Sequence, residues 1–130
     1  MENLLLSDPA RFINSIDYLV LKFAGVTNGS CQRHYTKILM HLTDAKMLES
    51  VKQKVAAIDL EPIAERCFDL LIDAKTPVAV KVFASEVLFN LRLRFPWINE
   101  ILADQIKIMM DGGKPAIQVR GKKLLKLLRL

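Results

Sequence analysis

The sequence has little of what most catalytic and metal sites require. It holds two cysteines, Cys31 and Cys67, and two histidines, His34 and His41. The cysteines are far apart and follow no metal-binding or redox spacing, so we expect two reduced structural thiols. A reactive thiol at Cys31, near a helix start, is the alternative. The histidines are about 10.5 Å apart along a helix, too far for one metal ion. We expect no metal, no cofactor and no catalytic residue, and therefore no enzyme.

Long apolar runs are also missing. No stretch approaches the roughly 20 residues that cross a bilayer. The N-terminus carries Glu2 where a secretion signal carries basic residues, and its apolar run at Leu4, Leu5 and Leu6 is short. We therefore expect a cytoplasmic protein with no membrane partner.

Strand-like alternation of apolar and polar residues is nearly absent, and helical spacing takes its place. Most of the five Pro and five Gly residues fall at the ends of the helical stretches or between them. There, Pro suits a first helical turn and Gly suits a helix end. The 52% hydrophobic content fits helices that pack on more than one side.

The predicted helices form antiparallel pairs with short connections. The pairs cover about residues 8–43, 60–94 and 97–129 of a single domain, and segment 45–57 is an inserted helix or a linker. We expect the first helices of the pairs at about 8–24, 60–74 and 97–110, and the second helices at about 30–43, 77–94 and 115–129.

The second helices resemble one another in sequence. A shift of 49 residues maps Ile38, Leu39 and Leu42 onto Val87, Leu88 and Leu91. A further shift of 37 maps these onto Leu124, Leu125 and Leu128. Such periods are typical of two-helix solenoid repeats. We expect an all-α fold, an α-α superhelix of about three stacked helix pairs of the HEAT-like or armadillo-like kind. An irregular helical bundle without a true repeat is the alternative.

The helix expected at 77–94 is apolar on two sides. One side carries Val78, Val82, Phe89 and Leu93, and the nearly opposite side carries Val80, Val87, Leu88 and Leu91. We expect such a helix to be sandwiched between neighbours. Ala84, and Gly121 at the equivalent place, allow a neighbouring helix to approach closely.

The run Thr-Pro-Val-Ala-Val-Lys-Val-Phe-Ala at 76–84, followed by Leu88 and Leu91, resembles the second helix of a HEAT repeat. Pro115, Val119-Arg120 and Gly121 resemble a degenerate second copy. The stretch 31–128 is also similar to a family of small bacterial HEAT-like proteins, in which an Arg-His-aromatic segment precedes a PVAVKVFA helix and an RG-basic-LL helix follows.

This resemblance implies a scaffold, because HEAT-like stacks offer extended surfaces that bind proteins and, in some cases, DNA. Some proteins of this kind are described as adenylosuccinate lyases. The sequence lacks the Ser-Ser and Met-Pro rich catalytic loop of that enzyme, so it does not support this activity.

Basic residues gather towards the C-terminus. Residues 105–130 hold seven bases and one acid. Aligning the second helices at 77–94 and 115–129 places Lys81, Ser85 and Arg92 level with Gln118, Lys122 and Arg129. If the second helices line the concave side of the stack, we expect them to present a cationic stripe. The candidate partner-binding residues are Arg33, Lys37, Lys81, Arg92, Lys122, Lys123, Lys126 and Arg129. Four interpretations are open: a solvating cap, a surface for an acidic protein, a phosphate-binding surface for nucleic acid, or a contact with acidic lipid.

Two other features are candidates for contacts. Acidic side chains recur every four residues at Glu61, Glu65, Asp69 and Asp73, and we expect a hydrated face there. Contact with a basic partner or with another subunit is the alternative. Trp97 is either a core residue or an interface aromatic.

We therefore expect a non-enzymatic protein–protein interaction scaffold that uses the second helices. The alternative is a HEAT-like nucleic-acid-binding module that uses the basic C-terminal helix. A homo-oligomer is also open.

Overall fold

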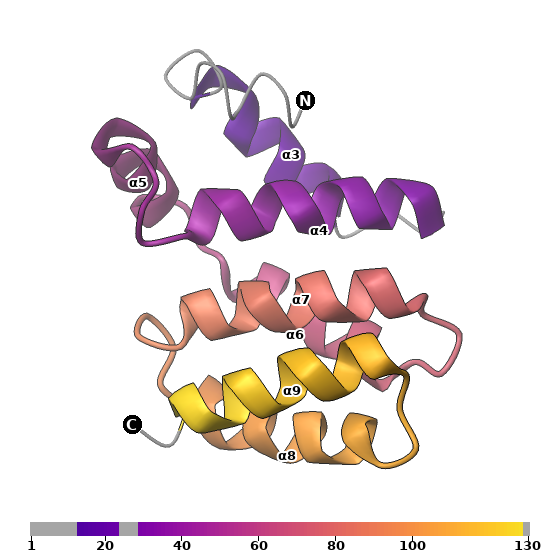
Figure 1. Cartoon of the computed structure of the whole chain (residues 1–130). Helices are drawn as coiled ribbons and strands as arrows, with labels where there is room; N and C mark the ends of the chain where they lie inside the picture. Colours follow the sequence, from indigo (N-terminus) through magenta and orange to yellow (C-terminus); the bar gives the residue numbers. More distant parts are fainter. Residues whose placement is uncertain (1–12, 24–28, 129–130) are drawn as a thin grey trace.

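A computed structural model gives the structure of the chain and describes residues 13–23 and 29–128 (Figure 1). Within these ranges every regular element is a helix, which confirms the predicted all-α fold class. The elements are the 3-10 helix η1 (Ile13–Ser15) and the α-helices α3 (Ile16–Phe23), α4 (Gly29–Thr43), α5 (Glu49–Ala56), α6 (Glu61–Ile72), α7 (Val78–Leu91), α8 (Ile98–Met110) and α9 (Pro115–Leu128).

The helices form two layers. The second helices of the predicted pairs, α4, α7 and α9, lie side by side and form the front layer in Figure 1. Behind them, α6 and α8 contact each other and form the back layer. Each back helix also packs against the front helix that follows it in the chain. This arrangement is consistent with the predicted α-α superhelix.

Several helix boundaries follow from local sequence chemistry. Pro62 occupies the first turn of α6, where its missing N–H costs no helical hydrogen bond. Gly112 adopts a φ of +72° directly after α8, a conformation that glycine reaches without strain. Pro115 then begins α9. Segment 45–57, open between helix and linker, contains the helix α5, which contacts α4.

The first predicted helix, at about 8–24, is described only in part. Its described part starts with η1 at Ile13 and continues as α3 to Phe23, while 8–12 and 24 lie outside the described residues. Ile16, Leu19 and Phe23 are buried, so the expected apolar face does enter the core.

The core is centred on α7, which contacts α4, α6, α8 and α9. Val80, Val87 and Leu88 on its inner side are fully buried. The expectation that this helix is sandwiched holds in part, because α7 lies between α4 and α9 but its second apolar side is covered only partly. In the turn after α7, Leu93 is 82% exposed, and Val82 and Phe89 are half-buried. The neighbouring helices pack beside and behind α7, so its outer side is only partly covered within the described chain.

Gly121 allows close packing of α9 on α8, as predicted. The residue is buried, and a β-carbon there would lie 2.5 Å from Met110 Sδ and 3.2 Å from Ile106 Cγ2. Ala84, at the equivalent place of α7, is also fully buried. Among the described residues, no helix combines the length and apolar character that a membrane crossing needs.

Candidate functional site

A row of side chains crosses the open side of the front layer. Lys37 of α4 places its Nζ 6.0 Å from the ring centre of Phe83 on α7. One turn further along α7, Glu86 lies 3.3 Å from Arg120 Nη1 of α9. Phe83 and Glu86 are three residues apart and therefore share one side of α7. Lys37, Phe83, Glu86 and Arg120 therefore lie on one surface that α4, α7 and α9 share, and we call this surface the front face.

The ion pair between Glu86 and Arg120 is only partly hydrated. The side chain of Glu86 is 17% exposed, and that of Arg120 is 46% exposed. Within the described part of the chain, Glu86 Oε1 accepts no hydrogen bond, so the pair is held by charge without an aligned hydrogen bond. A partly exposed pair of this kind contributes up to about 1 kcal/mol.

Apolar side chains extend the front face beyond this row. Val82, Phe89 and Leu93 follow one another at spacings of seven and four residues, so they share the open side of α7 and its C-terminal turn. The guanidinium of Arg92 lies 3.8 Å from the ring centre of Phe89. On α9, the neighbouring Val119 is 69% exposed. The surface therefore combines uncovered apolar area with a cation stacked on an aromatic ring.

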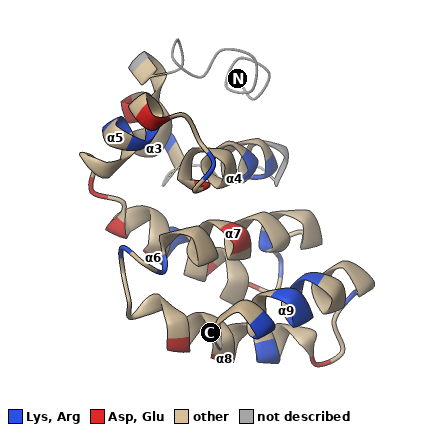
Figure 2. Ribbon diagram, turned by 60° about the vertical axis from the view of Figure 1, so that its left-hand side comes forward, with Lys and Arg blue, Asp and Glu red and all other residues tan. Residues whose placement is uncertain are grey.

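The charge of the front layer is strongly one-sided. The helices α4, α7 and α9 hold seven lysine and arginine residues and a single acidic residue, Glu86. Figure 2 shows this on α9, where several blue positions and no red one follow the helix. Because Glu86 is paired with Arg120, its charge is already offset by one of these bases. The front layer is thus a basic surface with an apolar centre.

The predicted basic residues do not form a single exposed stripe. Arg33, Lys122, Lys123 and Lys126 are exposed, whereas Lys37, Lys81 and Arg92 are half-buried; Arg129 lies outside the described residues. Ser85, expected level with Lys122, is only 3% exposed and donates a hydrogen bond to the Val82 carbonyl. Its small uncharged side chain is buried, so Ser85 contributes nothing to a basic surface between Lys81 and Arg92.

The bases of α9 also point in different directions. At 100° per residue, Lys122 lies on nearly the opposite side of the helix from Arg120, which reaches α7. Lys123 is three residues after Arg120 and shares its side. Lys123 therefore belongs to the front face, while Lys122 lies towards the outer edge of the stack.

Trp97 packs near two aromatic side chains and keeps part of its own surface exposed. It is 41% exposed at the start of α8, and its ring centre lies 5.9 Å from that of Phe68 and 6.3 Å from that of Phe95. The indole thus covers part of the core while one side stays open to solvent.

The remaining candidates lie at the surface or in the core. Glu61, Glu65, Asp69 and Asp73 are all exposed, as expected for a hydrated stripe.

The two cysteines differ in burial. Cys67 is fully buried on α6, and burial raises the pKa of its thiol far above the ordinary value, while the nearby Arg66 lowers this pKa by a smaller amount. Cys31 is exposed, and neither cysteine is in a disulfide. Among the described residues, no His, Cys, Asp and Glu side chains gather in a group that could hold a metal ion.

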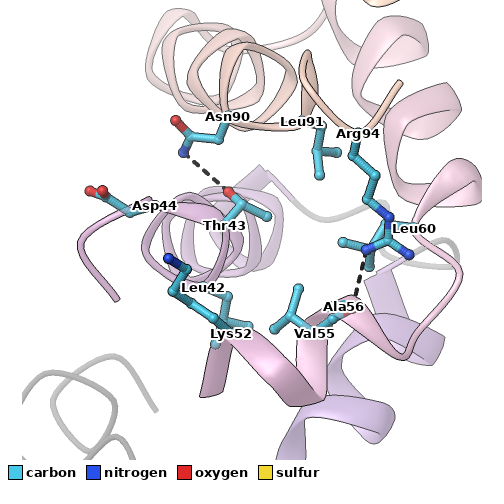
Figure 3. Close-up of a pocket in the computed structure, with 10 residues that line it drawn as sticks. All are labelled: Leu42, Thr43, Asp44, Lys52, Val55, Ala56, Leu60, Asn90, Leu91 and Arg94. Carbon is cyan, nitrogen blue, oxygen red and sulfur yellow. Dashed lines mark hydrogen bonds between the residues drawn. The ribbon is translucent and has the colours of Figure 1, made fainter. Parts of the chain in front are cut away.

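A small cavity of about 160 Å³ opens where the ends of α4, α5 and α7 meet (Figure 3). Asn90 donates hydrogen bonds to the Met40 carbonyl and to Thr43 Oγ1, both at 3.1 Å. Arg94 donates to the carbonyls of Val55 and Ile58 at the end of α5. Small-molecule sites usually measure roughly 300–1,000 Å³. The polar groups here therefore join helices and do not form a site for a sizeable ligand.

Phe83, Glu86, Val119 and Arg120 are front-face residues that the sequence did not single out. The contact between Glu86 and Arg120 joins positions 34 residues apart, and no local pattern reveals it. The apolar set Val82, Phe89 and Leu93 was visible as a second apolar side of one helix. Its exposure depends on which sides of α7 the neighbouring helices cover.

Comparison with protein-family models, with curated proteins and with solved structures finds no match.

Proposed function

We propose that the protein is a non-enzymatic protein-interaction scaffold of the HEAT-like kind, and that its front face binds an acidic amphipathic segment of a partner protein. The observation that carries this proposal is the open apolar side of α7, where Leu93 is 82% exposed. Exposed apolar side chains that lie together on a surface mark interaction sites. A partner helix would cover these side chains with its own apolar side.

Charge selects the partner. The apolar centre lies between basic side chains of α4, such as Arg33 and Lys37, and those of α9, such as Arg120 and Lys123. An acidic segment gains favourable contacts on both flanks, while a basic segment is repelled. The attraction acts over about 10 Å at 0.1 M salt, so binding weakens as salt rises.

A nucleic-acid-binding module is the second candidate. The exposed lysines of α9, Lys122, Lys123 and Lys126, favour it, because phosphate groups bind such side chains. The apolar centre argues for a protein partner instead, since Val82, Leu93 and Val119 offer a phosphate backbone no favourable contact. The two candidates therefore depend on different residues.

The test is a fluorescence-anisotropy titration of the protein onto a labelled helical peptide of about 18 residues, with leucines on one side and glutamates on the other. We expect a dissociation constant on the order of 10⁻⁴ M or tighter at low salt. Replacing Leu93→Ser and Val119→Ser together should weaken binding at least about tenfold, because the apolar contact is lost. The double substitution Arg33→Glu and Lys123→Glu should also weaken peptide binding, because it places negative charges beside the acidic peptide.

A peptide with lysines in place of the glutamates is the matched control and should not bind. A labelled DNA duplex is titrated under the same conditions. DNA binding that Lys122→Glu with Lys126→Glu removes, together with no binding of the acidic peptide, would replace the scaffold proposal by the nucleic-acid one. Unchanged peptide binding by the Leu93 and Val119 double variant would reject the front face as the site.

A further inference from the structure

The back layer has the opposite charge to the front layer. The helices α6 and α8 hold five acidic residues and two basic ones. The acids Glu61, Glu65 and Asp69 are exposed on α6, and Glu100 and Asp104 are exposed on α8. The two layers of one small protein thus carry charges of opposite sign on opposite sides.

The back layer also exposes apolar side chains. Ile101 is 50% exposed and Ile108 is 66% exposed, and their spacing of seven residues puts them on one side of α8. Between them in sequence, Gln105 donates a hydrogen bond to the Leu71 carbonyl at 3.4 Å. The next residue of α6, Ile72, is 66% exposed and lies at the same seam between the two helices.

Trp97 extends this seam. Trp97 lies at the N-terminal end of α8, and its ring packs against that of Phe68 on α6. Its side chain is 41% exposed. Tryptophan side chains are enriched at the energetic centres of protein interfaces. We call the surface formed by Ile72, Trp97, Ile101 and Ile108, together with the exposed acidic side chains of α6 and α8, the back face. It has the two properties that the front face requires of a partner, an apolar centre and negative charge.

We propose that the back face of one copy of this protein docks on the front face of a second copy. The proposal rests on the proposed function, because it uses the front face as one half of the contact. It makes that function more specific, because the partner is a second copy of the same protein. The same molecule carries the complementary surface, as exposed isoleucines flanked by acidic side chains on α6 and α8.

Charge favours this head-to-tail contact over a symmetric one. A front-to-front contact would bring two basic layers together, and a back-to-back contact would bring two acidic layers together. Like charges that face each other across an interface cost several kcal/mol. A front-to-back contact leaves one front face and one back face uncovered, so it repeats and builds open chains or closed rings.

The test is sedimentation velocity from micromolar to near-millimolar protein at low salt, with two variants that each disable one face. Ile72→Lys with Ile108→Lys disables the back face, and Leu93→Glu with Val119→Glu disables the front face. All four residues are well exposed, so both variants should keep the wild-type circular dichroism spectrum. Leu21→Lys, at a 77% exposed position on α3, is the matched control.

We expect the wild type and the Leu21 variant to grow beyond the dimer as concentration rises, and each face variant to stay monomeric. A mixture of the two face variants should form a one-to-one dimer, because one intact front face and one intact back face remain. A wild type that stays monomeric throughout overturns the proposal. Wild-type association without a dimer in the mixture also overturns it, because the contact would then be symmetric.

The proposed function stays separately testable. The Ile72 and Ile108 double variant keeps its front face, so it should still bind the acidic peptide as a monomer. If this variant binds the peptide while the wild type does not associate, only the self-assembly proposal fails. If no form of the protein binds the peptide but the mixture forms a dimer, the proposal of an acidic amphipathic partner segment fails instead.

Discussion

The two sides of α7 are nearly alike in composition but differ in their surroundings. Val80, Val87 and Leu88 on the inner side have no exposed surface. On the outer side, Val82 and Phe89 are half-buried and Leu93 is largely exposed. The inner side packs against the neighbouring helices, while the outer side is covered only in part, where Phe89 reaches the core. Burial is thus set by the arrangement of the helices around α7, and apolar character alone does not determine it.

Because the two sides of α7 differ in burial, we expect them to differ in their effects on folding stability and on partner binding. Apolar area that is removed from water on folding stabilises the fold, at roughly 25 cal/mol per Å². Apolar area that stays in water contributes little to folding and is available to a partner. Substitutions on the inner side of α7 should therefore change the free energy of unfolding, and substitutions on the outer side should change association.

The largest expected effect is on the inner side. Leu88→Ala should lower the free energy of unfolding by about 2–5 kcal/mol, because it leaves a cavity beneath α7. Leu93→Ala, on the outer side, should change it by less than about 0.5 kcal/mol. Urea denaturation of both variants measures the difference. Equal destabilisation by the two substitutions would mean that Leu93 is covered in solution.

A smaller effect is expected where α7 is joined to α4. Asn90→Ala removes two hydrogen bonds, to the Met40 carbonyl and to Thr43 Oγ1, and should cost about 1–2 kcal/mol. The substitution Asn99→Ala, at a similarly half-buried position on α8, is the control. If Asn90→Ala has no more effect than the control, the contact does not join the two helices.

The smallest effect is expected at the ion pair between α7 and α9. Glu86→Gln should cost less than about 1 kcal/mol at low salt, and the cost should shrink at high salt. A double-mutant cycle with Arg120→Met isolates the pair from other effects of each substitution. A coupling energy that does not change with salt would contradict a pair held by charge alone.

Much of the fold followed from local sequence patterns. Pro62, Pro115 and Gly112 mark helix boundaries because their backbone preferences act within one turn. The apolar spacing that maps Leu88 onto Leu125 indicated a repeated second helix. These features depend on neighbours in sequence, so a sequence reveals them.

The candidate site was less predictable because it depends on tertiary packing. The sequence alignment put Ser85 level with Lys122, but the packing of the helices buries Ser85 and leaves Lys122 exposed. Lys122 and Arg120 both counted as bases of one helix, but they lie on different sides of α9. The approach of Arg120 to Glu86 required the relative placement of α7 and α9, which local patterns do not specify.

The most direct test of the scaffold proposal maps the bound acidic peptide on the protein by ¹⁵N–¹H NMR, at a protein concentration where the free protein is monomeric. We predict chemical-shift changes on the front face, at Val82, Phe89, Leu93 and Val119, and none around Ile101 and Ile108 of the back layer. Changes confined to the back layer, or no changes at saturating peptide, would contradict the assignment of the open side of α7 as the docking surface.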